Sequence, residues 1–160
     1  MYLVDGNLSG SAFAELPSDV MVGVKGTLPG AFAPDAFQAR LLEVDPELTD
    51  FSYAAESYDT VTLIALAAQA GGATDGDTIA ANLQAVSAGG EKCSNFADCK
   101  ALLDEGKDID YDGVSGPIEF DANGEVTQAT MGVYEYVAND KYEARPDEFV
   151  VGAVPAPIED

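Results

Sequence analysis

The sequence predicts an α/β domain in which helices and strands pack in layers. Short apolar stretches interrupted by turns occupy about the first 30 residues, and segments with helical spacing follow to residue 108. From about residue 115 the apolar residues alternate with polar ones, which is the spacing of strands. The order of strands, helices and strands predicts layered α/β structure without the even βαβ alternation of a complete doubly wound sheet.

The N-terminal part is expected to contain strands. Residues 1–6 form a short apolar stretch that runs into a turn, and residues 9–19 suit a short helix or a loop. Residues 20–30 are predicted to form a second strand, which ends at Pro29 and Gly30.

The first predicted helix covers residues 33–46. Pro34 can occupy its first turn, and Pro46 ends it because proline has no backbone N–H to donate. The stripe expected to be buried consists of Phe37, Leu41, Leu42 and Val44.

The second and strongest predicted helix lies within residues 52–72. Ser52 or Ser57 can cap its start, and a glycine pair ends it. Between Val61 and Ala70 it is apolar on nearly every face. A helix of this kind is expected to be wrapped by other structure rather than to lie on a surface.

Two further helices are predicted in residues 75–90 and 95–108, the first of them capped by Asp75 or Asp77. Their inward side chains are expected to be Ile79, Leu83 and Val86 in the first and Phe96, Cys99, Leu102 and Leu103 in the second.

Residues 115–152 are predicted to form strands and hairpins. Ile118 and Phe120 point to one side of their strand, and Asn123 and Gly124 suit a hairpin turn because both tolerate positive φ. A second turn is expected at "ANDK", and the proline-rich tail 154–160 is expected to be loose.

The charge limits the classes of partner. Seven basic residues face 29 acidic ones, for a net charge of −22, so neither nucleic acid nor an anionic membrane surface is expected to bind. One interpretation of this charge is solubility, and another is adaptation to salt. The chain has no histidine, which removes histidine-based catalytic triads and most transition-metal sites, and no cofactor is implied.

Nothing in the chain suggests a membrane span or a leader. No run of about 18 apolar residues is present, so no span is expected. The opening "MYLVDGNLSG" lacks the basic start and apolar stretch of a signal peptide, and any export signal is expected upstream of Met1.

Two cysteines lie close together in "GEKCSNFADCK". Their spacing fits neither the CxxC redox motif nor a zinc site, which needs more ligands. A disulfide between Cys93 and Cys99 would stabilise the fold by about 2 kcal/mol in the chain-entropy model. It would indicate an oxidising, exported location, whereas two reduced cysteines would suit the cytosol.

The stretch "DIDYDGVSGPIE" matches the calcium-loop pattern D-x-[DN]-x-[DN]-G-x5-E. Asp108, Asp110, Asp112 and Glu119 occupy ligand positions, and Gly113 occupies the turn position. A helix must follow such a loop, but here a strand and a hairpin are predicted. We therefore expect a solvated acidic turn and no metal site.

Three stretches of the sequence occur in an order that is typical of one family. They are "ESYDTVTLIALAAQAGG", "TDGDTIAANLQAVS" and "YDGVSGPIEFDANGEVTQATMGVYEYVANDKYE". They resemble the C-terminal half of the substrate-binding proteins of branched-chain amino acid ABC transporters, the Leu/Ile/Val-binding type. The openings "YLVDGNLS" and "GVKGTLPG" are similar to the strand at that family's binding cleft and to the strand that follows it.

The resemblance implies a type I periplasmic-binding-protein fold, with two α/β lobes, three crossing segments and a ligand in the cleft. Members of the family are more than twice as long, so this chain is expected to be a fragment containing parts of both lobes. Residues 1–30 would belong to the second lobe, residues 31–126 to the first, and residues 127–160 would return to the second lobe and form the tail. Uncovered sheet edges and helix faces would make the fragment self-associate.

The resemblance also implies a function. Family members are not enzymes: they capture a small ligand outside the cytoplasm, close around it and present it to the permease subunits of an ABC importer. The ligand here would be an amino acid or a related molecule. Asp5 matches the position whose acidic side chain pairs with the ligand ammonium group, often a glutamate in the family, although Asp5 could instead simply begin a turn.

Other interpretations remain. Tyr58 and Asp59 could contribute to the cleft, or could serve packing and the helix dipole. A ligand sensor of the same fold is an alternative function. A carboxylate-based hydrolase is a weaker one, with Glu119 and Asp121 as an acid/base pair on one strand face.

Overall fold

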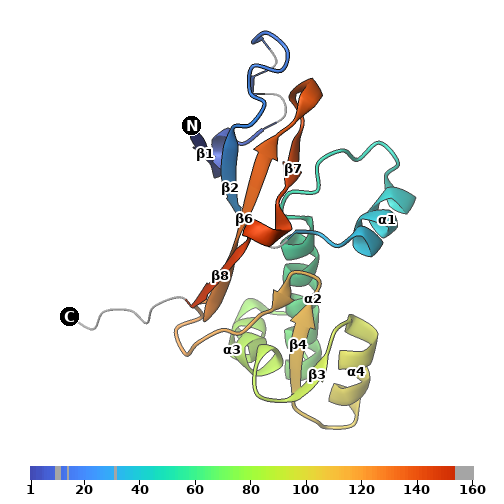
Figure 1. The fold of residues 1–160 in the computed structure, drawn as a ribbon. Helices are drawn as coiled ribbons and strands as arrows, with labels where there is room; N and C mark the ends of the chain where they lie inside the picture. The colour runs from blue at the N-terminus through green and yellow to red at the C-terminus, as the bar shows by residue number, and fades with distance from the viewer. Residues whose placement is uncertain (10–11, 14, 31, 154–160) are drawn as a thin grey trace, which may run out of the picture. The chain divides into compact units, whose positions relative to one another are not determined.

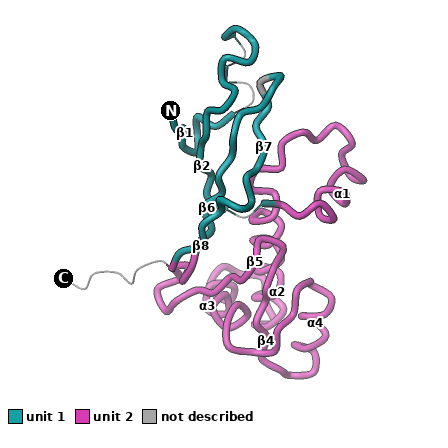
Figure 2. The backbone as a smooth tube through the Cα atoms, in the orientation of Figure 1, with its two compact units in different colours: residues 1–32, 129–152 teal, residues 33–128, 153–160 magenta. Residues whose placement is uncertain are grey.

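The computed structural model describes residues 1–160 except residues 10–11, 14, 31 and 154–160, so the tail expected to be loose lies outside the described residues. The chain divides into two compact units, coloured teal and magenta in Figure 2. Unit 1 consists of residues 1–32 and 129–152, and unit 2 of residues 33–128 and 153–160. Each unit is therefore built from separate stretches of the chain.

Unit 1 is built on one mixed sheet (Figure 1). Its strands are β1 (Tyr2–Val4), β2 (Lys25–Pro29), β6 (Gln128–Tyr136), β7 (Tyr142–Ala144) and β8 (Val150–Ala153). The order is β1-β2-β6-β7, and β8 also pairs with β6. β1 runs parallel to β2, and β6 is antiparallel to β2 and β7. Within the described residues of this unit, three short 3₁₀ helices lie in the connections between strands, namely η1 (Asp5–Asn7), η2 (Ala138–Asp140) and η3 (Pro146–Glu148).

The core of unit 1 lies on one face of this sheet. Its buried members are Leu3, Leu8, Met21, Leu28 and Tyr136. The hydroxyl of Tyr136 donates to the carbonyl of Ser9 at 2.8 Å and accepts from the backbone N–H of Ser9 at 3.1 Å, which fastens the loop after β1. Tyr2 and Val4 alternate with Leu3 and lie on the other face, largely exposed.

The strand predicted for residues 20–30 is shorter than expected. β2 begins only at Lys25, because residues 18–23 form turns in which the N–H of Val22 donates to the carbonyl of Asp19. Asp19 itself has a left-handed backbone, and its carboxylate accepts the N–H of Asn139 at 2.8 Å. Asn139 also has positive φ, in the turn predicted at "ANDK".

Unit 2 contains four helices and a small sheet among its described residues. The helices are α1 (Asp35–Val44), α2 (Ala54–Gly71), α3 (Gly76–Ser87) and α4 (Phe96–Asp104). The strands are β3 (Glu91–Cys93), β4 (Ile109–Gly113) and β5 (Gly116–Pro117). β3 runs parallel to β4, and β5 is antiparallel to it. No helix among the described residues is long and apolar enough to cross a membrane.

The larger core of unit 2 lies between α2, α3, α4 and this sheet. Its buried members are Leu63, Leu66, Ala67, Val86, Cys93, Cys99, Ile109 and Tyr111. Ile79, Leu83, Leu102 and Leu103 pack against it as predicted, together with Ile118 and Phe120 from the following hairpin. A smaller cluster forms around Ala33, Phe37 and Ala55.

Three predictions about the helices were wrong. Neither serine caps α2, because the N-cap is Tyr53, which has a left-handed backbone. α2 is not wrapped on all faces, since Val61 is 67% and Ile64 42% exposed. The expected stripes were also too wide, because Leu42 and Val44 of α1 and Phe96 of α4 remain exposed.

Candidate functional site

Asp59 is a buried acidic side chain of unit 2 that accepts several hydrogen bonds. It lies on α2 past the first turn and is 1% exposed. Its Oδ1 accepts the hydroxyl of Tyr111 at 2.7 Å and the N–H of Val114 at 3.0 Å. Its Oδ2 accepts the N–H and the hydroxyl of Ser115 at 2.7 and 2.6 Å. The carboxylate therefore anchors the β4–β5 turn to α2, and the expected interaction with the helix dipole was wrong, because Glu56 is the acid of the first turn.

The surroundings of Asp59 are shaped to hold it. Burial raises the pKa of the Tyr111 hydroxyl, and its hydrogen bond to Asp59 raises that pKa further, so Tyr111 remains a donor. Gly113 lies directly against the carboxylate, and a Cβ there would collide with Asp59. The sequence signal that could have predicted this anchor is an acidic residue inside an apolar helix. A buried carboxylate requires hydrogen-bond donors, so such a residue indicates polar partners around it.

Tyr58 serves packing rather than a polar site. Its ring contacts Phe37 edge to face, with ring centroids 5.3 Å apart. The guanidinium of Arg40 lies over both rings, 5.7 Å from the centroid of Phe37 and 5.5 Å from that of Tyr58. This cluster holds α1 against the start of α2.

Of the residues in the calcium pattern, Asp110, Asp112 and Gly113 lie on strand β4, whereas Asp108 and Glu119 lie outside it. Asp110 and Asp112 belong to β4, and Lys92 of β3 forms ion pairs with both, at 2.9 and 3.0 Å. Hydrogen bonds to Asp110 and then Asp112 raise the pKa of Lys92. Asp110 is only 5% exposed, so the expectation of a solvated acidic turn was wrong. Within the described part of the chain, no three His, Cys, Asp or Glu residues are grouped to hold a metal ion.

Asp121, one residue of the predicted acid/base pair, accepts hydrogen bonds from the backbone of its own turn. The carboxylate of Asp121 accepts the N–H groups of Asn123 at 2.8 Å and Glu125 at 3.0 Å, and these bonds lower its pKa. Asp121 therefore stabilises the hairpin turn that ends at Gly124, whose φ is 81°.

Asp5 lies in unit 1, directly after β1. It begins η1, is exposed, and its carbonyl accepts the N–H of Leu8 at 2.9 Å. Because β1 is paired in parallel with β2, Asp5 stands at the carboxyl end of a parallel strand. In open α/β sheets, ligands bind outside these carboxyl ends.

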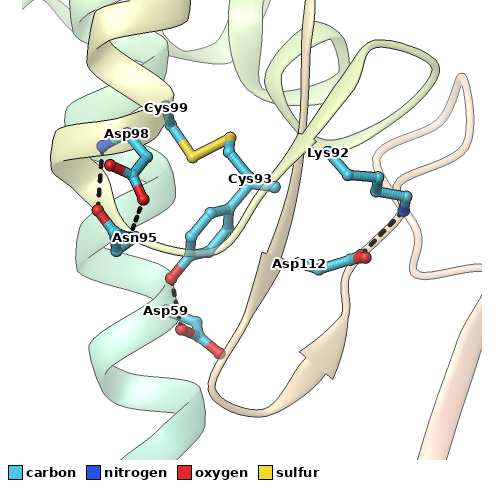
Figure 3. Close-up of a disulfide and its surroundings, with 8 residues drawn as sticks. Asp59, Lys92, Cys93, Asn95, Asp98, Cys99 and Asp112 are labelled. Carbon is cyan, nitrogen blue, oxygen red and sulfur yellow. Dashed lines mark hydrogen bonds and ion pairs between the residues drawn. A yellow bond between two sulfur atoms is a disulfide. The ribbon is translucent and has the colours of Figure 1, made fainter.

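A disulfide joins Cys93 of β3 to Cys99 of α4, with the two Cα atoms 5.3 Å apart. Figure 3 shows the disulfide with the side chains of Asn95 and Asp98 near it. Cys93 is 8% and Cys99 0% exposed, so the bond lies within the core of unit 2. The side chain of Asn95 between them caps α4 by accepting the N–H of Asp98 at 3.0 Å.

Comparison with known proteins identifies the fold. Residues 34–139 match the receptor family ligand binding region. The chain belongs to this family. The structure is also similar to that of a leucine-binding protein, LivK, from Thermotoga maritima, with a TM-score of 0.58 and 19% sequence identity. No curated protein matches the chain.

Membership of the ligand binding region family confirms the resemblance and the α/β fold class predicted from the sequence. The chain has an α/β fold of the type I periplasmic-binding-protein kind and forms part of that fold. The similarity to the leucine-binding protein covers 90% of this chain and 35% of that chain. The chain therefore spans about a third of the protein whose fold it shares.

Proposed function

We propose that the chain is part of a solute-binding protein that captures an amino acid or a related small molecule for an ABC importer. The observation that carries this proposal is the family match, since it places a ligand binding region over residues 34–139. The fold shared with a leucine-binding protein over 90% of the chain favours the amino acid class.

The arrangement of the chain supports a two-lobed protein. Residues 1–32 with 129–152, and residues 33–128, form separate compact units. Apart from residues 153–160, these limits lie within a few residues of those expected for the second and first lobes. In such proteins a ligand binds between the lobes and stabilises their closed arrangement.

Asp5 is our candidate for the ligand ammonium group. Its position at the carboxyl end of β1 supports this role, because a carboxylate there adjoins the region in which α/β sheets bind ligands. A desolvated carboxylate pairs strongly with an ammonium group. The ligand carboxylate would be held by backbone N–H groups at a helix start and by hydroxyls from further elements of the fold.

Binding without turnover is the proposed activity, with permease subunits as partners and a location outside the cytoplasm. Asp121, one half of the rival acid/base pair, is engaged by its own turn, which speaks against a hydrolase. The Cys93–Cys99 disulfide favours an oxidising, extracytoplasmic compartment.

A ligand-sensing domain of the same fold is the second candidate, favoured by the receptors that the family name includes. Sensing and transport share the binding step. The two functions are distinguished by whether the protein supports uptake by a permease encoded beside it.

The test is a thermal-shift screen of amino acids and small organic acids, with the 160-residue chain and with any longer natural polypeptide that contains it. A ligand present at 100 times its Kd should stabilise the protein by about 2.7 kcal/mol and should be recovered chemically unchanged. Conversion of the ligand, or stabilisation only by molecules without an amino group, would contradict the proposal.

A further inference from the structure

The backbone of Asp5 has an unusual conformation. Its φ is 27°, in the positive range that residues with a side chain rarely adopt. Glycine takes positive φ at no steric cost, yet the neighbouring Gly6 does not have it, so the strain falls on the acidic residue instead. Strained residues persist only where the surrounding structure holds them, and they cluster at functional sites.

The side chain of Asn7 closes the turn that contains Asp5. Its Oδ1 accepts the backbone N–H of Val4 at 2.9 Å, so it bonds to the last residue of β1 from the far side of Asp5 and Gly6. Asn7 is exposed and is not a member of the core of unit 1. Its bond to Val4 therefore restrains the turn and adds little to the packing of the unit.

The other restraints on this turn come from the core and the backbone. The N–H of Leu8 donates to the carbonyl of Asp5 at 2.9 Å, and the Leu8 side chain is 5% exposed. The next residue, Ser9, is fastened by the hydroxyl of the buried Tyr136. Asp5 therefore lies between a strand and a segment anchored in the core, and the Asn7 side chain connects its turn back to the strand.

We infer that Asn7 is a positioning residue for the carboxylate of Asp5. By binding the N–H of Val4 it keeps the Asp5 backbone in its strained conformation before an amino acid arrives. A group that is already ordered loses less freedom on binding, so the turn raises the affinity without a contact between Asn7 and the amino acid. This inference rests on the proposed function, in which Asp5 pairs with the ammonium group of that amino acid.

Binding of L-leucine, measured by isothermal titration calorimetry, tests this role. L-leucine is the probe because the structure is similar to that of a leucine-binding protein. Asn7→Ala should weaken binding about fivefold or more, which corresponds to one neutral hydrogen bond. Asn7→Asp keeps an acceptor and should restore most of the affinity. The control is Asn95→Ala, which removes the same kind of bond at the start of α4 and should bind like the wild type.

Two further measurements separate positioning from a general loss of stability. In a chain that already carries Asp5→Ala, adding Asn7→Ala should change the affinity little, because no carboxylate remains to be positioned. Isocaproate, which is leucine without its amino group, should bind equally to the wild type and to Asn7→Ala. If Asn7 had only a structural role, its removal would weaken binding in both measurements.

The turn itself can be measured without L-leucine. Hydrogen exchange of the Val4 amide should be faster in Asn7→Ala than in the wild type and should stay slow in Asn7→Asp. Asp5→Gly should melt at a higher temperature than Asp5→Ala, because glycine relieves the strain of positive φ. Both Asp5 variants should bind L-leucine more weakly than the wild type, since both lack the carboxylate.

The outcomes that would overturn the inference differ from those that would overturn the assignment of Asp5. If Asp5→Ala weakens L-leucine binding and Asn7→Ala does not, only the role of Asn7 is wrong. Equal losses for L-leucine and isocaproate in Asn7→Ala would also exclude positioning. If neither variant changes the affinity, or if the wild type does not bind L-leucine, the role of Asn7 and the assignment of Asp5 for this amino acid are both wrong.

Discussion

The hydroxyl of Tyr111 donates a 2.7 Å hydrogen bond to Oδ1 of Asp59, a residue 52 positions earlier in the chain. Both side chains are buried, Tyr111 on β4 and Asp59 on α2. The bond connects the longest helix of unit 2 to the central strand of its small sheet, and the same carboxylate holds the turn that follows. The stability of unit 2 should therefore depend strongly on one acid.

Replacement of Asp59 tests this dependence. Asp59→Ala should lower the free energy of unfolding by about 3 kcal/mol or more, because it leaves several buried donors unsatisfied. Tyr111→Phe removes one bond and should cost about 1–2 kcal/mol. Urea unfolding followed by circular dichroism measures both. Equal effects of the two changes would contradict the central role of the carboxylate.

Gly113 should be intolerant of a side chain. In Gly113→Ala the new Cβ would collide with the Asp59 carboxylate, and we expect a loss of about 1–3 kcal/mol in unfolding free energy. Gly76→Ala is the matched control, since no atom lies within 4 Å of a Cβ at that helical position. It should be neutral or slightly stabilising. A similar loss in both variants would show that contact with Asp59 is not the cause.

Reduction of the disulfide should destabilise the fold. Breaking the bond between Cys93 and Cys99 releases a short loop and should cost about 2 kcal/mol in unfolding free energy. Differential scanning calorimetry with and without dithiothreitol measures the effect as a fall in Tm. The double variant Cys93→Ala, Cys99→Ala should melt at the same temperature in both buffers. A wild-type Tm that reductant leaves unchanged would mean that the bond contributes nothing.

Acid should weaken the hairpin held by Asp121. Backbone hydrogen bonds from Glu125 and Asn123 lower the pKa of Asp121 below its usual value of 3.8. The folded state therefore prefers the ionised form. The contribution to stability is fully present above the unfolded pKa and is lost as the pH falls through the folded pKa.

Two variants isolate this effect. Asp121→Asn keeps the turn acceptor but cannot titrate, so its stability should fall less steeply with acid than that of the wild type. Asp121→Ala should be less stable at neutral pH as well. Thermal melts between pH 7 and about pH 2 provide the comparison. Parallel pH profiles for wild type and Asp121→Asn would exclude Asp121 as the source.

Asp5→Ala tests the proposed ammonium contact, with an amino acid identified in the thermal-shift screen. The change should weaken binding by about 2 kcal/mol or more if the pair is desolvated. Asp5→Glu retains the charge and should bind more tightly than Asp5→Ala. Isothermal titration calorimetry gives both affinities, and an unchanged affinity in Asp5→Ala would remove the assignment.

Local patterns were sufficient for much of unit 2. The apolar spacing and the glycine stop of α2 lie between Leu63 and Gly72, and the cap and apolar spacing of α3 lie between Asp75 and Val86. Each helix is therefore specified by its own segment. The hairpin at Gly124 follows from the same local rule, because its turn chemistry lies in four consecutive residues.

Local sequence patterns did not predict strands β3 and β4. β3 has only three residues, and β4 carries Asp110 and Asp112 among its five. Each is a strand because it pairs with the other, and the pairing is favoured by Lys92 between the two aspartates. The acidic pattern alone therefore resembled a calcium loop.

By itself, the sequence determined the family, the α/β class, the limits of most helices and the chemistry available for a site. Only the tertiary structure decided that Asp59 is a buried anchor, that Asp110 belongs to a strand, and that Val61 and Ile64 remain exposed. The physical reason is that caps, periodicity and turns depend on neighbouring residues. The burial of a charge or an apolar face depends on what distant segments bring against it.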